Sequence, residues 1–456
     1  MPGLFDERAH YVGWRDIFKR RKHSDDDVAQ TQVFAGPDAR PLVAPLAGNP
    51  MPRFQDRANG LSLRSTRSPI RMRMRSAFTP SQPVSNVSMF AGRRGTLVSL
   101  IRAIEDQQTH IVLYGDRGIG KTSLLHVMAS LAREAGYLVR YVSCSDSSTF
   151  SDTFKMVAGD IPLIYHTEID PTSERAEAGG TLADLMPAGK ATVAQVSEML
   201  GKLTGTRLLI VLDEFDRSDA EEFRRAIAEL IKNLSDRGSR VQLVIAGVAG
   251  NLTELIRHIP SIRRNIVGLA VPNMSDDEVR ELIQIGSKAS GLSYAEAAVR
   301  LVVRIANGSP YLASLLAQHA GIAGLDRGVS VVEQQDVMIA LDRALSEVEQ
   351  RVSPACLHNF AQITENATHA VLVEVAREAL AKGGRIAPAP AKPEINADEY
   401  RRELMALDTR FQLLEPTPDA PGGGYQFREE GAALYFWLRS AHHNDVGGQA
   451  RIAVTG

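Results

Sequence analysis

One ten-residue stretch constrains this chain more than any other. Residues 114–123 read Tyr-Gly-Asp-Arg-Gly-Ile-Gly-Lys-Thr-Ser and contain the pattern G-x-x-x-x-G-K-[ST] of a phosphate-binding loop. An apolar run at 111–114 precedes the loop, and apolar residues at helical spacing follow it. Glycines let the loop turn several N–H groups toward one anion, and the new helix adds the positive end of its dipole. The stretch therefore predicts a strand, a phosphate loop and a helix.

The loop supplies the candidate ligands of a nucleotide. Lys121 is expected to reach the β- and γ-phosphates, and the Thr122 hydroxyl is expected to hold Mg²⁺. The predicted phosphate-binding set is Gly115, Asp116, Arg117, Gly118, Ile119, Gly120, Lys121, Thr122 and Ser123.

A second motif lies about a hundred residues later. Five apolar residues at 208–212 run into Asp213 and Glu214, which is the Walker B pattern of a buried strand ending at a nucleotide. Asp213 is expected to assist the Mg²⁺ shell, and Glu214 to orient or deprotonate the attacking water. Asn251 follows a later strand and has two readings, a contact to the γ-phosphate or its water, and a turn or helix N-cap residue.

Composition excludes several classes of protein. The chain has 456 residues and a formal net charge of −2, so it is not a uniformly basic nucleic-acid binder. Its two cysteines suggest neither a disulfide framework nor a zinc site, which favours a reducing, cytoplasmic setting. No run approaches the roughly 20 apolar residues of a membrane helix, and the charged start lacks a signal-peptide core.

The apolar patterns predict an α/β chain with several domains. Residues 1–85 lack a sustained apolar period and are expected to be disordered. Within them, the arginine-rich residues 64–75 are either a tether for DNA or another polyanion, or a solvated arm. A parallel sheet is expected over residues 86–272, with strands at 111–114, 137–144, 208–212, 241–248 and 266–271.

The rest of the chain is expected to be mostly helical. Residues 273–352 predict a helical lid, with helices at 276–289, 294–306, 310–322 and 331–350. Residues 353–442 predict a winged helix, made of helices at 355–363, 368–382 and 397–408 and of a hairpin over 411–427, with a linker at 383–393. The tail, 443–456, is expected to be disordered.

Together these features resemble the AAA+ P-loop ATPases of the origin-recognition-complex-like group, which merge in sequence with the STAND signalling ATPases. The resemblance implies ATP and Mg²⁺ as ligands and an ATP-dependent homo-oligomer. It implies that Phe90, Gly92 and Arg93 lie near the adenine. It also implies that Arg264, with Arg263 as the fallback, is either an arginine finger toward a neighbouring subunit or an ordinary surface residue.

One departure from the origin-type pattern bears on function. Where those proteins carry a lid arginine, this chain has Gly308-Ser309-Pro310, which is closer to the Gly-x-Pro turn of STAND proteins and places Pro310 near the nucleotide. Two functions are therefore expected. The first is an ATP-hydrolysing switch on DNA, as an initiator, loader or transposition-type regulator, acting through residues 64–75 and the winged helix. In such domains the third helix, here 397–407, usually reads the major groove, and its candidate DNA contacts are Tyr400, Arg401 and Arg402. The alternative is a STAND-like signalling or defence ATPase whose C-terminal domain binds a protein partner.

Overall fold

The computed structural model describes residues 67–218, 221–249, 251–255, 262–363, 369–417, 423–429 and 431–454. All of them belong to one compact unit that begins at Leu63. Residues 1–66, including the first part of the arginine-rich stretch, lie outside the described residues.

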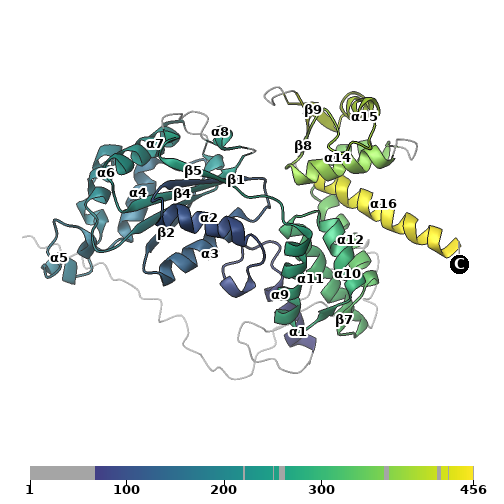
Figure 1. The fold of residues 1–456 in the computed structure, drawn as a ribbon, viewed down its shortest axis with the longest axis horizontal. Coiled ribbons are helices and arrows are strands. Elements are labelled where there is room, and N and C mark those ends of the chain that lie inside the picture. Colours follow the sequence, from purple (N-terminus) through teal and green to yellow (C-terminus); the bar gives the residue numbers. More distant parts are fainter. Residues whose placement is uncertain are drawn as a thin grey trace, which may run out of the picture. The chain divides into compact units, whose positions relative to one another are not determined.

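A five-stranded parallel sheet forms the centre of the first domain (Figure 1). Its order is β2-β3-β4-β1-β5, so β1 lies between β4 and β5. The strands are β1 (His110–Gly115), β2 (Leu138–Ser143), β3 (Leu208–Asp213), β4 (Val241–Val248) and β5 (Ile266–Ala270). The predicted parallel sheet is confirmed, and its register brings the carboxyl ends of β1 and β3 to the same edge as β4.

Helices cover both faces of this sheet, so consecutive residues of the central strands are buried although their side chains point to opposite faces. Ile111 and Leu113 belong to the core under α2 (Arg94–Glu105) and α3 (Lys121–Glu134). Val112 belongs to the core on the opposite face. That face is covered mainly by α4 (Phe150–Gly159), α6 (Val193–Gly201) and α7 (Glu221–Asp236), while the short α5 (Glu174–Glu177) and α8 (Leu252–Leu255) lie in connections.

The predicted helical lid follows the sheet. Ser275 caps its first helix in a capping box with Glu278, and Pro310 occupies the first turn of its third helix. The lid helices are α9 (Asp276–Ser290), α10 (Glu296–Ala306), α11 (Pro310–Arg327) and α12 (Gln334–Glu349), and a short parallel pair, β6 (Ser293–Tyr294) and β7 (Val331–Val332), joins their ends.

A winged helix forms the last domain. Its helices are α13 (Pro354–Ala361), α14 (His369–Ala381) and α15 (Ala397–Thr409), and the hairpin of β9 (Leu414–Pro416) and β10 (Tyr425–Phe427) follows them. The expected linker contains a further strand, β8 (Arg385–Ile386), which gives a sheet of order β8-β10-β9. Phe360 packs its ring against Phe427 and Phe436 in the core of this domain.

The C-terminal segment differs from the sequence-based expectation. Helix α16 (Ala432–Val454) runs through most of the tail that we expected to be disordered. No proline follows Pro421 in the sequence, so nothing in this stretch removes a backbone donor from the helix.

The N-terminal segment also corrects the expectation of disorder, within residues 67–85. Helix α1 (Arg67–Ala77) packs against α9 and α11 of the lid. Met74 and Phe78 are fully buried there. Each fills a notch that a glycine leaves in a lid helix, because a Cβ at Gly286 would lie 2.1 Å from the Phe78 ring, and one at Gly321 would lie 2.1 Å from Cε of Met74.

Polar contacts reinforce this docking. The side chain of Gln318 donates a hydrogen bond to the carbonyl oxygen of Phe78, and Arg71 forms an ion pair with Asp326 at the end of α11. The side chains of Arg73 and Arg75 stay exposed on the outer face of α1. The helix therefore buries one apolar stripe and presents Arg73 and Arg75 to solvent.

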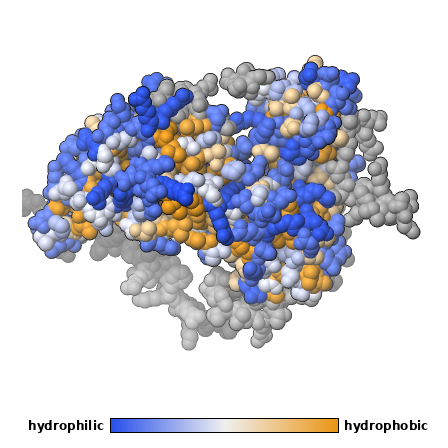
Figure 2. Space-filling model, viewed as in Figure 1, coloured by the Kyte–Doolittle hydropathy of each residue, from blue (hydrophilic) through white to orange (hydrophobic). Residues whose placement is uncertain are grey.

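The surface of the described residues mixes hydrophilic and hydrophobic side chains on the face shown in Figure 2. The more exposed large apolar residues, such as Met72, Met156 and Met405, lie on three separate helices. Isolated exposed apolar residues are ordinary in soluble domains. Among the described residues, no helix is long and apolar enough to cross a membrane.

The glycine notch gives a testable prediction. Gly286→Ala should loosen α1, because the added methyl group would meet the Phe78 ring. Gly324→Ala in α11 is the matched control, since its methyl group meets no atom closer than 3.6 Å, and this exchange within a helix is worth roughly 0.5–1 kcal/mol in favour of alanine. We expect trypsin to cleave at the arginines of α1 faster in the first variant alone.

A second substitution checks the cause. Adding Phe78→Leu to Gly286→Ala shortens the ring side chain and should restore part of the protection. Equal cleavage of Gly286→Ala and wild-type protein would contradict the assigned docking of α1.

Candidate functional site

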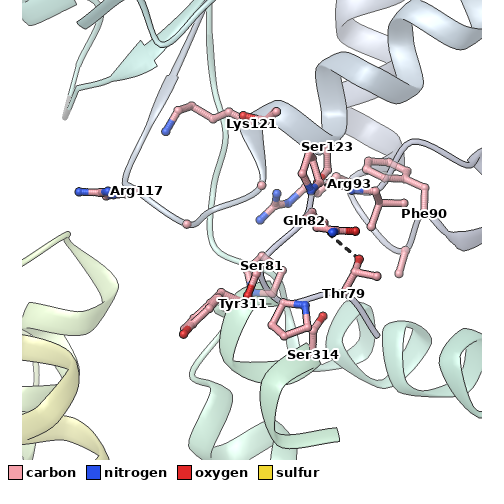
Figure 3. Close-up of a pocket in the computed structure, with 18 of the residues that line it drawn as sticks. Thr79, Ser81, Gln82, Phe90, Arg93, Arg117, Lys121, Ser123, Tyr311 and Ser314 are labelled. Atoms are coloured by element: carbon pink, nitrogen blue, oxygen red, sulfur yellow. Dashed lines mark hydrogen bonds between the residues drawn. The ribbon is translucent and has the colours of Figure 1, made fainter. Parts of the chain in front are cut away.

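A cavity of about 620 Å³ opens beside the phosphate loop (Figure 3). Four parts of the chain form its walls: the loop with the ends of β3 and β4, the stretch 77–84 from the end of α1, residues 89–93 before α2, and the lid helices α9 and α11. In Figure 3, Lys121 and Ser123 come from the loop side, while Tyr311 and Ser314 come from α11. The volume lies within the range of cofactor sites.

The phosphate loop has the backbone shape that its glycines allow. Gly118 and Gly120 have φ of 73° and 90°, in the left-handed region where glycine is favoured. Helix α3 starts at Lys121, so its first N–H groups face the cavity side of the loop. The loop can therefore bind an anion with backbone groups alone.

Lys121 is held inside this loop. Its Nζ donates hydrogen bonds to the carbonyl oxygens of Gly115 and Asp116, each at 2.8 Å. Burial lowers the pKa of Lys121, and the carboxylates of Asp216 and Asp213 partly offset that effect. These bonds use two of the three N–H donors of the ammonium, so one donor remains for a phosphate oxygen.

The structure brings Thr122 and Asp213 together. The Thr122 Oγ1 donates to Oδ2 of Asp213 at 2.8 Å, although 91 residues separate them. Two hard oxygen donors at the mouth of a phosphate loop fit Mg²⁺, which usually takes one or two protein ligands and completes its shell with phosphate and water. Among the described residues, no group of three or more His, Cys, Asp or Glu side chains forms a separate metal site.

Glu214 lies at the cavity wall in a constrained conformation. Its φ is 54°, which is uncommon for a residue with a side chain. Its carboxylate accepts hydrogen bonds from Ser143 at 3.0 Å and from Arg217 at 2.9 Å. Both donors bind the same oxygen, Oε2, so the carboxylate can still orient a water molecule through Oε1.

The segment before α2 is clamped to the lid by two glutamates. The N–H of Gly92 donates to Glu281 at 3.0 Å, and the N–H of Arg93 donates to Glu278. A Cβ at Gly92 would lie 2.8 Å from Glu278, so glycine is required at this close approach. Phe90 and Arg93 line the cavity.

Arg93 is buried between the loop and the lid. Its Nη2 donates to the carbonyl of Pro272 at 3.3 Å, and a Cβ at Gly120 would lie 2.7 Å from its Nη1. Burial lowers its pKa to about 10, while the charge of Glu278 acts in the other direction. Among the described residues its Nε has no hydrogen-bond partner. The guanidinium thus adjoins the phosphate loop as well as the predicted adenine side.

The lid and the winged helix both approach the loop. Pro310 lines the cavity, and its Cγ would lie 3.7 Å from a Cβ at Gly120. Gly383, with φ of 59°, lies against Asp116, since a Cβ there would be 2.9 Å from Oδ1. In addition, Asn307 donates to the carbonyl of Arg377 at 3.2 Å, which joins the lid to α14.

Sequence reasoning missed one wall of the cavity. Residues 79–84 line it, and the N–H of Val84 donates to the Ser123 hydroxyl of the loop at 3.0 Å. This stretch, which we call the strap, is anchored to the lid through Phe78. A weak sequence signal existed, because Ile70, Met74 and Phe78 recur every four residues, but the surrounding arginines obscured it.

Several predicted residues, all described by the structure, lie outside the cavity wall. Asn251 and Arg264 are exposed, and Arg264 lies just before β5. Four more predicted residues do not line the cavity: Gly92, Gly115, Asp116 and Ile119. The remaining predicted residues line the cavity: Phe90, Arg93, Arg117, Gly118, Gly120, Lys121, Thr122, Ser123, Asp213, Glu214 and Pro310.

The winged helix carries little exposed positive charge at its predicted DNA-reading helix. Tyr400, a residue expected to contact DNA, is fully buried and donates to Glu378 at 2.6 Å, which corrects that expectation. Arg401 is exposed but forms an ion pair with Asp398 at 3.4 Å. Helix α15 therefore offers Arg401 and Arg402 among acidic neighbours.

Comparison with known proteins supports the interpretation of the sheet domain as a P-loop ATPase domain. Residues 90–245 match the family model of the AAA ATPase domain. Among curated proteins, the sequence finds no match.

Solved structures with similar folds include the Aeropyrum pernix Orc1 protein in complex with DNA, at 17% identity and a TM-score of 0.42, covering 80% of this chain and 94% of that one. Cdc6p from Pyrobaculum aerophilum matches at 15% identity and a TM-score of 0.43, covering 81% and 98%. The RuvB Holliday junction branch migration motor of Thermotoga maritima matches at 14% identity and a TM-score of 0.39, covering 76% of this chain and 95% of that one.

The position of Glu214 gives a prediction. Glu214→Gln should leave Mg-ATP binding intact and slow hydrolysis by roughly 10²-fold or more, the scale of a lost general base. Calorimetry and phosphate release measure the two effects. Lys121→Ala is the matched control, and it should lose ATP binding because it removes the buried cation. Unchanged hydrolysis in Glu214→Gln would place the base elsewhere.

Proposed function

We propose that this chain, whose residues 90–245 form an AAA-type P-loop ATPase domain, binds and hydrolyses ATP and acts as a nucleotide-dependent switch. The observation that carries the proposal is the hydrogen bond between Thr122 and Asp213 at the mouth of the phosphate loop. It joins the two motifs that phosphoryl-transfer sites use, and the adjoining cavity offers enough space for a nucleotide.

In this proposal each residue has a distinct task. The loop N–H groups and Lys121 bind the phosphates, while Thr122 and Asp213 hold Mg²⁺, which neutralises charge between the β- and γ-phosphates. Glu214 orients the attacking water through Oε1, while Ser143 and Arg217 hold its Oε2. We expect basal turnover to be slow without a partner, as is common for nucleotide-dependent switches.

The walls of the cavity explain how occupancy becomes a switch. The strap, the loop and the lid each contribute one wall, so a bound nucleotide contacts all three. The winged helix in turn touches the loop at Gly383 and the lid at Arg377. Any ligand that fits only one arrangement of these parts shifts their equilibrium toward that arrangement.

DNA is the target that we favour for the switch, in the role of an initiator, loader or transposition-type regulator. Arg73 and Arg75 are exposed on α1, and they continue the arginine-rich stretch 64–75. Phosphate contacts require such positive charge. The winged helix contributes less, because Tyr400 is buried and Arg401 is paired with Asp398.

A STAND-like signalling or defence ATPase is the second candidate. The observation that favours it is Pro310, which lies beside Gly120 of the loop. In that case the winged helix binds a protein partner.

A matched pair of double variants tests the DNA target. Arg73→Ala with Arg75→Ala should weaken binding to duplex DNA more than Arg401→Ala with Arg402→Ala, and should flatten the salt dependence by up to about 2 in slope. Fluorescence anisotropy at several salt concentrations measures both effects. A larger loss of affinity in Arg401→Ala with Arg402→Ala would make the winged helix the main DNA-binding element. A wild-type protein that does not bind DNA at low salt would favour the signalling candidate.

Arg264 gives a prediction about subunits. We propose that it acts on the nucleotide of a neighbouring copy, since it is exposed and lies outside its own cavity. Arg264→Ala should lower hydrolysis by up to about 10³-fold, the scale of an arginine finger, and leave ATP affinity unchanged. Mixing this variant with Glu214→Gln protein should restore some activity. A protein that stays monomeric with ATP in light scattering would contradict the proposal.

A further inference from the structure

Asp213 accepts hydrogen bonds from three parts of the fold. Its Oδ2 receives the Thr122 hydroxyl at 2.8 Å and also the hydroxyl of Tyr141 at 2.5 Å. Its Oδ1 receives the backbone N–H of Glu214 at 2.9 Å. Asp213 is only 4% exposed, so these donors replace most of the water that a carboxylate would otherwise bind.

The register of the sheet places Tyr141 at this carboxylate. Strand β2 pairs in parallel with β3, so that Tyr141 lies opposite Val211 and Ser143 lies opposite Asp213. Because side chains two residues apart share one face of a strand, β2 directs two hydroxyl groups to the same side. The Tyr141 hydroxyl donates a hydrogen bond to Asp213, and the Ser143 hydroxyl donates one to Glu214.

A second contact holds the tyrosine ring in place. The ring stacks on His126, with 4.7 Å between centroids and 20° between planes. His126 lies on α3, the helix that also carries Thr122. The ring therefore packs against the helix whose first turn donates to the same carboxylate oxygen, and little freedom remains in either group.

We propose that Tyr141 is a positioning residue that orients Asp213 for the divalent cation of the nucleotide site. This inference rests on the proposed ATP-binding function and extends it to a residue that lies outside the cavity wall. A hydroxyl that donates to an ionised carboxylate makes a short, strong bond. Groups that hold metal ligands in this way tune metal affinity by about 10–100-fold.

The tyrosine stays a donor at neutral pH. Burial raises its pKa well above the ordinary value, and the hydrogen bond to Asp213 raises it further. Its contribution is to fix the orientation of the Asp213 carboxylate through the hydrogen bond to Oδ2.

Tyr141→Phe in the full-length protein tests the inference, because it removes the hydroxyl and keeps the stacked ring. Tyr137→Phe is the matched control, since this tyrosine lies just before β2 and only partly packs against the α3 side of the core. ATP affinity is measured by calorimetry in EDTA and over a series of Mg²⁺ concentrations. We expect unchanged affinity in EDTA, and about a 10-fold higher Mg²⁺ requirement for Tyr141→Phe alone.

Three results separate the possible failures. Wild-type Mg²⁺ dependence in Tyr141→Phe, with or without a lower melting temperature, would make the tyrosine merely structural and overturn the inference. A wild-type protein that binds ATP without responding to Mg²⁺ would overturn it as well, and would leave ATP binding standing. A wild-type protein that does not bind ATP would overturn the proposed function first.

Discussion

Two carboxylates at the start of α9 join the sheet domain to the lid, and the cavity depends on them. Glu278 accepts the N–H of Arg93 with one oxygen and the N–H of Ser275 with the other. One side chain therefore caps a helix and clamps the segment that precedes α2. Glu281 accepts the neighbouring N–H of Gly92. This pair attaches the lid to the segment before α2 through two backbone N–H groups.

The clamp also determines where the charges of the site lie. Gly92 and Arg93 have φ of 65° and 55°, and this pair of left-handed residues turns both N–H groups toward α9. The Arg93 side chain then lies beneath Gly120 and Pro310, where water has little access. A buried cation beside a phosphate loop destabilises the empty site and interacts favourably with a bound phosphate. Arg93 therefore favours the nucleotide-bound state.

Local patterns were enough to predict the sheet, the loop and the two acids that follow β3. Each is a short stretch whose own residues specify its structure, such as the glycines around Lys121. Features that depend on distant partners could not be predicted. Helix α1 is held by Gly286 and Gly321, and Tyr141 is directed to Asp213 by strand register. The repeat of Ile70, Met74 and Phe78 hints at an amphipathic helix, but the partners of α1 and of Tyr141 cannot be identified from the neighbouring sequence.

The docking of α1 has a consequence for folding of the chain. The hydrogen bond between Gln318 and Phe78 joins residues 240 positions apart, and the ion pair of Arg71 spans 255. Contacts between such distant residues form late, because the loop between them must close first. During synthesis, α1 leaves the ribosome long before the lid that receives it. Its apolar stripe therefore stays exposed to solvent until the lid has been synthesised. The arginines on its other face help to keep this segment soluble during that time.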